Sequence, residues 1–405
     1  MDMAKPIIRF KGYQDDWEQR KLGELAEIVG GGTPSTSVDS YWDGDIDWYA
    51  PAEIGEQIYL KSSQRKITEE GLNKSSAKVL PVGTVLFTSR AGIGKTAILL
   101  KEGCTNQGFQ SIVPNKDKLD SYFIFTRSEE LKRYGEIVGA GSTFVEVSGK
   151  QMANMELMMP TTMDEQQKIG GYFSNLDNLI TLHQRKCDET KRLKKYMLQK
   201  MFPQNGEKVP EIRFSGFTDD WEQRKLPEFV SFFNGLTYTP DDVEETGTLV
   251  LRSSNVKNGE IVDADNVYVN DKVVTSENVH EGDIIVVVRN GSRALIGKHA
   301  QIKDSMPNTV IGAFMSGMRS EHSSFVNALL DTSAFENEIA KNMGATINQI
   351  TGYMFSKMEF MIPSGNEQQK IGEYFQSLDN LITLHQRELE NLQNIKKFML
   401  GKMFV

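Results

Sequence analysis

Two segments of the chain, residues 165–203 and 367–405, carry mainly apolar residues at positions with alternating spacings of four and three. The second series is Ile371, Phe375, Leu378, Ile382, His385, Leu389, Leu392, Lys396, Met399 and Met403; the first is Ile169, Phe173, Leu176, Ile180, His183, Cys187, Thr190, Lys194, Met197 and Met201. This is the seam along which long helices pair. S/T-x-x-E patterns before them, Thr162 with Glu165 and Ser364 with Glu367, are typical of capping boxes. The pattern predicts two helices of about 55 to 60 Å at about 1.5 Å per residue.

These segments belong to a tandem duplication. They are identical at 25 of 39 positions, and residues 6–25 and 210–229, around the shared stretch DDWEQRKL, are identical at 14 of 20. Since the repeated helices alternate along the chain with two less similar regions, the simplest arrangement pairs them antiparallel, with a pseudo-twofold axis between the halves. The helices are then a spacer between two domains.

The regions between the repeats, roughly residues 26–164 and 230–366, keep landmarks in the same order. Gly83 and Gly282 each precede an apolar run that predicts a buried strand, and Arg90 and Arg289 follow these runs. Helices are predicted near residues 120–138 and 322–343, and strands at runs such as 267–270 and 359–362, which favours an α+β fold. The predicted order is domain 1 (1–161), spacer helix 1 (162–203), domain 2 (204–363) and spacer helix 2 (364–405).

The composition of 405 residues is that of a folded, multidomain protein with 39% hydrophobic and 25% charged residues. The net charge of −9 argues against a nucleic-acid partner. The charge is uneven: residues 165–203 carry eight Lys/Arg against four Asp/Glu, and the segments outside both helices carry about −13. A DNA-binding face must therefore be a local patch. Two cysteines without metal-ligand spacing, no signal peptide and no membrane-length apolar run predict a cytoplasmic protein without bound metal.

Two diverged copies of one fold on a rigid spacer match a DNA target with two half-sites, because B-DNA presents equivalent groove faces about one turn apart. Different domains imply an asymmetric target. Basic side chains in Gly-punctuated loops after the strands are candidates for phosphate or base contacts: Arg90, Lys95, Arg289, Arg293 and Lys298.

The DDWEQRKL segments, the GGTPS stretch at residues 31–35 and the paired EQQKIG…LDNLITLHQR helices resemble type I restriction-modification specificity subunits. The resemblance covers essentially the whole chain. It implies two target-recognition domains that read double-stranded DNA, and helices that bind modification subunits, expected to be two. The second domain departs from the pattern, with NGLTY at residues 234–238 in place of GGTPS.

The resemblance also implies that adenine methylation and any cleavage belong to partner chains, with S-adenosylmethionine on the methyltransferase and no cofactor bound here. Whether restriction or translocase subunits join is left open. Within this interpretation, the predicted additional DNA contacts are Thr33, Ser35, Thr143 and Thr346, and the predicted partner contacts on the helices are Phe173, Leu176, Ile180, Phe375, Leu378 and Ile382.

Several motifs have an alternative interpretation. The GIGKT stretch at residues 92–96 lacks the first glycine of a P-loop, because position 89 is Ser89. The repeated Arg and Lys residues could form structural salt bridges instead of DNA contacts. Packing is favoured over base stacking for Trp17 and Trp221. An interface role is favoured over catalysis for His183 and His385.

No catalytic signature for adenine methylation, hydrolysis or cofactor binding is found, so the sequence predicts a non-catalytic protein. Three rivals remain at this point. A stand-alone scaffold would bind proteins through its coiled-coil helices, a monomeric DNA-binding regulator would act without a methyltransferase, and a cryptic DNA-modifying enzyme would be active as a single chain. A steep dependence of DNA affinity on salt separates DNA binding from the scaffold.

Overall fold

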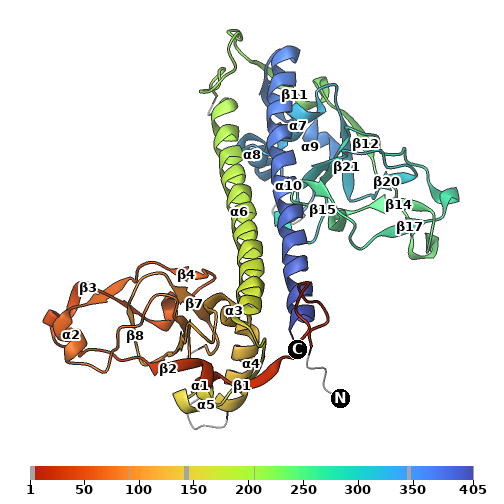
Figure 1. The fold of residues 1–405 in the computed structure, drawn as a ribbon. Helices are drawn as coiled ribbons and strands as arrows, with labels where there is room; N and C mark the ends of the chain where they lie inside the picture. Colours follow the sequence, from red (N-terminus) through yellow and green to blue (C-terminus); the bar gives the residue numbers. More distant parts are fainter. Residues whose placement is uncertain (1–4, 91, 141–145, 205, 344–347, 405) are drawn as a thin grey trace. The chain divides into compact units, whose positions relative to one another are not determined.

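The computed structural model describes residues 5–90, 92–140, 146–204, 206–343 and 348–404. Contacts divide the chain into unit 1, residues Met1–His183 with Glu388–Val405, and unit 2, residues Gln184–Arg387. The two longest helices, α6 (Met163–Met201) and α10 (Gly365–Met403), each contribute one part to each unit. Figure 1 shows both helices and the strands that belong to each unit.

Unit 1 contains a five-stranded sheet in the order β2-β9-β6-β7-β4, a three-stranded sheet β5-β3-β8 and a two-stranded sheet β1-β10. Its strands are β1 (Glu18–Lys21), β2 (Ala26–Gly30), β3 (Trp42–Tyr49), β4 (Tyr59–Leu60), β5 (Arg65–Ile67), β6 (Val85–Phe87), β7 (Thr96–Leu99), β8 (Cys104–Thr105), β9 (Gln110–Pro114) and β10 (Glu156–Met159). Its shorter α-helices are α1 (Leu22–Leu25), α2 (Glu69–Asn73), α3 (Ser121–Thr126), α4 (Ser128–Gly139) and α5 (Gly149–Ala153).

Unit 2 contains two four-stranded sheets, β12-β21-β18-β19 and β13-β17-β14-β20, and two-stranded sheets β11-β22 and β15-β16. Its strands are β11 (Glu222–Lys225), β12 (Ser231–Asn234), β13 (Val243–Glu244), β14 (Thr248–Leu251), β15 (Val256–Lys257), β16 (Glu260–Ile261), β17 (Val267–Val269), β18 (Ile284–Val287), β19 (His299–Gln301), β20 (Thr309–Ile311), β21 (Met315–Arg319) and β22 (Glu359–Ile362). Its shorter α-helices are α7 (Ser323–Leu330), α8 (Ser333–Asn342) and α9 (Gly352–Phe355).

The two units repeat one sheet topology. The order β2-β9-β6-β7 in unit 1 corresponds to β12-β21-β18-β19 in unit 2. The parallel pair β3–β8 likewise corresponds to β14–β20. Gly83 and Gly282 both adopt positive φ, 89° and 91°, immediately before the central strands β6 and β18, a conformation that glycine adopts without a Cβ clash. The predicted α+β class and the predicted structural repeat are confirmed.

The helices predicted near residues 120–138 and 322–343 are each divided into two. In unit 1, buried Arg127 lies between α3 and α4, where its guanidinium bonds to Glu130 and to the Met158 carbonyl. In unit 2, Thr332 separates α7 from α8, and its hydroxyl accepts a hydrogen bond from the Phe335 amide at 3.4 Å. The prediction of single helices was wrong because a buried polar anchor and an N-cap interrupt the regular spacing.

The long helices follow the predicted seam, since each of its twenty positions is buried or partly buried. A repeated ion pair fixes the direction of pairing within each unit. In unit 1, Lys396 Nζ lies 2.6 Å from Asp177 Oδ1, and in unit 2, Lys194 Nζ lies 2.5 Å from Asp379 Oδ1. In both pairs a residue early in one helix meets a residue late in the other. The helix segments are therefore antiparallel within each unit.

An aromatic cluster joins each domain to the end of a long helix. In unit 1, the Phe404 ring lies 6.1, 5.6 and 6.0 Å from the rings of Trp17, Phe123 and Phe173. In unit 2, the Phe202 ring lies 5.9, 5.6 and 6.0 Å from the equivalent rings, Trp221, Phe325 and Phe375. Both tryptophans are buried. Their predicted packing role is confirmed.

The start of each long helix carries a buried ion pair instead of a complete capping box. The Glu165 amide bonds to the Thr162 hydroxyl at 3.3 Å, but the Glu165 carboxylate accepts hydrogen bonds from Arg9 at 2.6 and 2.8 Å. In unit 2, the Glu367 carboxylate accepts hydrogen bonds from Arg213 at 2.7 and 2.8 Å. The predicted reciprocal bond from each glutamate was wrong, because the glutamate binds the arginine of the preceding repeat.

We expect Glu367→Gln to lower the free energy of unfolding of unit 2 by about 3 to 5 kcal/mol, because it leaves the Arg213 guanidinium buried without its counter-charge. The two side chains are 1% and 12% exposed. Hydrogen exchange in increasing urea, read on peptides of unit 2, measures the loss. Glu228→Gln is the control: it breaks the exposed pair with Arg224 and is expected to cost less than about 1 kcal/mol. Equal losses in both variants would contradict the prediction.

Candidate DNA interface

The loops that follow the central strands carry the predicted basic residues. In unit 1, the Thr88 amide bonds to the Lys95 carbonyl at 3.0 Å, and in unit 2, the Val287 amide bonds to the Lys298 carbonyl at 2.8 Å. These bonds confirm the predicted correspondence of the two loops. Because the loop in unit 1 joins β6 to β7, it is a hairpin rather than the strand-to-helix turn of a P-loop.

The GGTPS loop lies against the turn between β8 and β9. The Gly32 amide bonds to the Thr105 carbonyl at 2.8 Å, and a Cβ on Gly31 would lie 1.9 Å from the Asn106 carbonyl oxygen. Trp48 Nε1 donates to the Gly32 carbonyl at 2.8 Å. Glycine is required here because the backbones approach too closely for a side chain.

The fold brings two of the predicted loops of unit 1, the GGTPS loop and the loop of Arg90, against the turn between β8 and β9. The Thr33 hydroxyl bonds to the Gln107 side chain, and Gly108 next to it lies against Arg90, whose Nε would be 3.6 Å from a Cβ at that position. Arg90 also lies 4.0 Å from Glu146 with both side chains about one third exposed, so this pair is weak. The Arg90 guanidinium is therefore partly accessible at the surface beside the turn between β8 and β9.

The corresponding place in unit 2 is a cleft of about 710 Å³. It is lined by the NGLTY segment, the start of the turn after β14 and the turn between β20 and β21, including Leu236, Tyr238, Arg252 and Phe314. Arg289 lies at this place, with its guanidinium carbon 5.1 Å from the centre of the Phe314 ring. Arg252 and Phe314 are candidate DNA contacts that sequence reasoning missed, because neither has a like residue at the matching place of the first domain.

The other predicted DNA contacts are distributed along the same loops. Ser35 is exposed, and its hydroxyl lies 2.8 Å from that of Ser37. Lys95 and Arg293 are exposed and Lys298 is partly exposed, but Arg293 and Lys298 do not line the cleft of unit 2. Thr143 and Thr346 lie outside the described residues. Contact of any of these residues with DNA stays a prediction.

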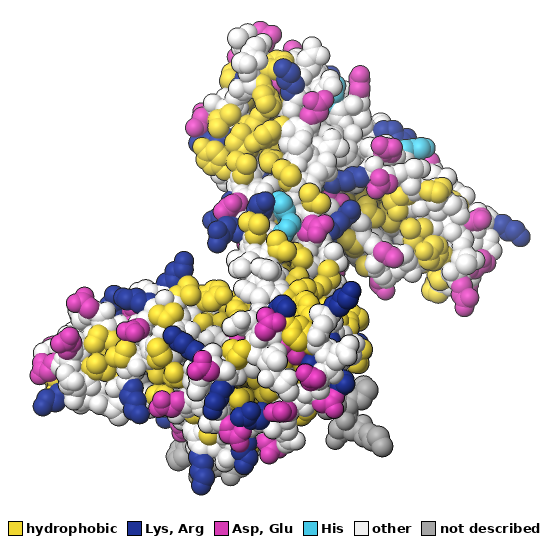
Figure 2. All heavy atoms as spheres, in the orientation of Figure 1, with side chains coloured by type: hydrophobic (Ala, Val, Ile, Leu, Met, Phe, Trp, Pro, Cys, Tyr) yellow, Lys and Arg dark blue, Asp and Glu magenta, His cyan; other side chains and the backbone are white. Residues whose placement is uncertain are grey.

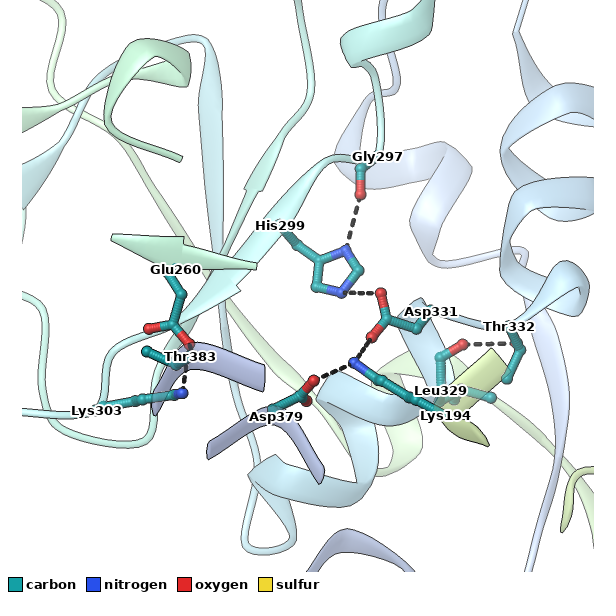
Figure 3. A network of polar contacts seen from close by, with 10 residues as sticks. All are labelled: Lys194, Glu260, Gly297, His299, Lys303, Leu329, Asp331, Thr332, Asp379 and Thr383. Carbon is teal, nitrogen blue, oxygen red and sulfur yellow. Dashed lines mark hydrogen bonds and ion pairs between the residues drawn. The ribbon is translucent and has the colours of Figure 1, made fainter. Parts of the chain in front are cut away.

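A polar network fixes the domain of unit 2 to the helices (Figure 3). Lys194 Nζ on α6 lies 2.6 Å from Asp331 and 2.5 Å from Asp379 on α10. On the other side of Asp331, His299 Nε2 on β19 lies 3.4 Å from its carboxylate, while His299 Nδ1 lies 3.0 Å from the Gly297 carbonyl. The basic position Lys194 is thus a structural anchor.

The charges of this network depend on one another. Burial raises the pKa of the Asp331 carboxyl, but His299 and Lys194 outweigh this effect and lower the pKa well below its ordinary value. Burial lowers the pKa of His299, but its bond to Asp331 outweighs burial and raises the pKa overall. Burial raises the pKa of Asp379 although Lys194 opposes it. Asp331 is therefore the firmly ionised carboxylate between His299 and Lys194.

Four of the six predicted partner contacts on the helices require a correction, and the other two stay predictions. Phe173, Leu176, Phe375 and Leu378 are buried within their units, and Ile180 and Ile382 are only partly exposed. A partner cannot reach the buried ones because they fill the domain-to-helix core. The large apolar residues that are exposed on the helices lie one position before seam residues: Leu179, Leu182, Leu193, Tyr196, Leu381, Leu384, Ile395 and Phe398. Figure 2 shows hydrophobic side chains gathered at the surface along the helices.

Among the described residues, no group of three or more His, Cys, Asp or Glu side chains could hold a metal ion. The same part of the chain contains no helix long and apolar enough to cross a membrane. His183 and His385 are partly buried at their seam positions. The polar groups that could serve a function in the described residues thus lie in the loops at the ends of strands and at the contacts between each domain and the long helices.

Comparisons with known proteins match this arrangement. The chain matches the type I restriction modification DNA specificity domain over residues 14–192 and again over residues 218–394. The MjaIX specificity subunit of Methanocaldococcus jannaschii is 34% identical over 218 residues, which are 53% of this chain and 46% of that protein. The match therefore spans about half the length of that relative. The MjaVIII specificity subunit of the same organism is 22% identical over 394 residues, covering 95% of this chain and 91% of that protein.

The fold also has a counterpart among solved structures. The crystal structure of the type I restriction-modification system S subunit from M. genitalium matches with a TM-score of 0.67 at 14% identity, covering 99% of both chains. Two copies of an α+β domain that alternate with two long helices define a class of DNA specificity proteins. The chain belongs to the family of type I restriction-modification specificity subunits.

We expect His299→Thr, which installs the residue of the matching position Thr96, to change how the stability of unit 2 depends on pH. Because the folded pKa of His299 lies above 6.5, its protonated form stabilises unit 2 fully below that pH, and the contribution is lost as pH rises through the folded pKa. Thermal unfolding from about pH 6 to about pH 9 should show this loss in the wild type but not in the variant. His322→Thr, which changes a partly exposed histidine outside the network, should keep the wild-type profile. An unchanged profile in His299→Thr would contradict the assignment.

Proposed function

We propose that this chain reads a bipartite, asymmetric target in double-stranded DNA, with one half-site for each domain, and docks two adenine methyltransferase subunits through its helices. The chain itself has no catalytic role and binds no cofactor; S-adenosylmethionine is held by the partner, and the complex works in the cytoplasm. The observation that carries the proposal is the repeat of one sheet topology with different side chains in corresponding loops.

The repeated topology supports two half-sites because equivalent loops lie at the same place of each domain. Different half-sites follow from the different loops: GGTPS with Thr33 and Gln107 in unit 1, and an apolar cleft with Arg252 in unit 2. Basic side chains at these places, Arg90 and Arg289, supply local positive charge on a chain whose net charge is −9. This local charge supports DNA binding by a chain that is acidic overall.

The exposed apolar residues on the helices support two docking sites of one kind. Unit 1 exposes Leu179, Leu182, Ile395 and Phe398, and unit 2 exposes the matching set, Leu381, Leu384, Leu193 and Tyr196. Each residue precedes a seam residue, so all lie on the same flank of their helix. Large apolar side chains that gather at a surface mark protein interaction sites. Two equivalent patches favour two copies of one partner.

The first test maps N6-methyladenine in a methylation-free host that expresses this chain with a modification subunit from the same source. We expect one gapped, asymmetric motif that is absent when either chain is omitted. Exchange of residues 230–363 for another variable domain should change one half-site only. If an assembled complex writes no motif and binds no DNA, the scaffold interpretation replaces DNA reading.

The docking patches can be tested separately. We expect Leu182→Asp and Leu384→Asp each to reduce the bound methyltransferase from two copies to one, because each puts a charge into one apolar patch. The side chains are 41% and 51% exposed, so neither change disturbs the core. Native mass spectrometry measures the copy number. Gln393→Asp, which adds the same charge to an exposed position just after a seam residue, should retain both copies. Two copies on both patch variants would contradict the assignment of the patches.

A further inference from the structure

The two domains hold corresponding loops in the same backbone arrangement. In unit 1, the Gly32 amide bonds to the Thr105 carbonyl at 2.8 Å, and the Asn106 amide bonds to the Tyr49 carbonyl at 3.0 Å. In unit 2, the equivalent bonds join Leu236 to Ile311 at 2.7 Å and Gly312 to Leu251 at 2.9 Å. We call this arrangement of three adjoining segments the loop cradle: residues 31–34, 49–53 and 105–108 in unit 1, and residues 235–238, 251–255 and 311–314 in unit 2.

The turns after β3 and β14 are held by an equivalent hydrogen bond from a backbone amide to a side-chain oxygen three residues later. The Ala50 amide bonds to the Glu53 carboxylate at 2.9 Å, and the Arg252 amide bonds to the Asn255 side-chain oxygen at 2.9 Å. Position 50 in the first cradle is therefore structurally equivalent to position 252 in the second. By the same backbone bonds, position 32 is equivalent to position 236, and position 108 is equivalent to position 314.

At all three matched positions, the side chain in the second cradle is larger than the one in the first. The first cradle has Gly32, Ala50 and Gly108; the second has Leu236, Arg252 and Phe314. The large side chains of the second cradle line the cleft of about 710 Å³. Because the two cradles have the same backbone arrangement, these three side-chain differences change the shape and chemistry of the surface that each domain presents.

The second cradle combines a guanidinium with an exposed aromatic ring. Arg252 is held by the Asp265 carboxylate at 3.1 Å, and its Nε is buried with no hydrogen-bond partner among the described residues. Phe314 is 56% exposed, and the Arg289 guanidinium lies over its ring. An exposed phenylalanine beneath one guanidinium group, in a cleft that a second arginine also lines, suits a surface with both apolar and acceptor character, as the major-groove edges of bases have.

We infer that Arg252 and Phe314 are specificity-determining residues of the second domain, and that the loop cradle is the part of each domain that reads base edges. This inference rests on the proposed function. In the second half-site, a guanidinium donates to the acceptor edge of guanine, and the apolar rim contacts a thymine methyl group. The residues at the matched positions of the first cradle are too small to reach the bases, so Thr33, Gln107 and Arg90 contact the base edges of the first half-site.

The test is the methylated motif written by the complex of the full chain with its modification subunit. Arg252→Ala installs the residue of the first cradle, and Phe314→Ala removes the ring. Each should lower the preference for the favoured base at one or two positions of the same half-site by about tenfold, and leave the other half-site unchanged. Arg252→Lys should also weaken that preference, because lysine cannot present two donors in a fixed plane.

Matched controls separate reading from folding. Arg224→Ala removes an exposed arginine paired with Glu228, and Phe217→Ala removes a ring 5.4 Å from the Lys370 ammonium; neither lies in the cradle. Both controls should retain the wild-type motif. If the wild type writes a motif and the cradle variants write the same one, the inference is overturned while the proposed function stands. If both half-sites change alike, the inference also fails. A wild-type complex that writes no motif overturns both.

Discussion

Each recognition domain depends on an aromatic side chain from the far end of a long helix. Phe404 completes the cluster around Trp17 in unit 1, and Phe202 completes the cluster around Trp221 in unit 2. Burial of an aromatic ring stabilises a fold by more than a typical hydrogen bond between neutral groups does. The first part of each long helix belongs to one unit, and its last part covers the core of the other. Removal of either helix would therefore expose the core of a domain.

The repeat separates what must stay the same from what can differ. The joints between domain and helix reuse the same pairs, such as Arg9 with Glu165 and Arg213 with Glu367, in both halves. The loop cradles share only the backbone arrangement, and their side chains differ. A change in a cradle leaves the buried joints untouched, since no joint residue lies in it. The side chains of the cradles are thereby free to vary without loss of the joints between domain and helix.

Sequence alone predicted the architecture well, because repetition and heptad spacing report directly on helices and duplicated domains. Gly83 and Gly282 also located the central strands correctly. The role of Glu165 was missed because the capping pattern is local, whereas its partner Arg9 is 156 residues away along the chain. Arg252 and Phe314 were missed because their place in the cleft arises from backbone pairing between segments distant in sequence. Comparison of the two repeats did not indicate these residues either, because the first domain has Ala50 and Gly108 at the matching positions.

The position of Phe404 has a consequence for biosynthesis. A ribosome makes the chain from the amino terminus, and domains that are complete can fold while synthesis continues. Phe202 is made before the domain it closes, so the second domain finds this ring already present. The first domain, in contrast, must keep the surface around Trp17, Phe123 and Phe173 open until Phe404, the residue just after α10, emerges. Until residue 404 is synthesised, the nascent first half therefore carries an aromatic cluster that its own residues do not cover completely.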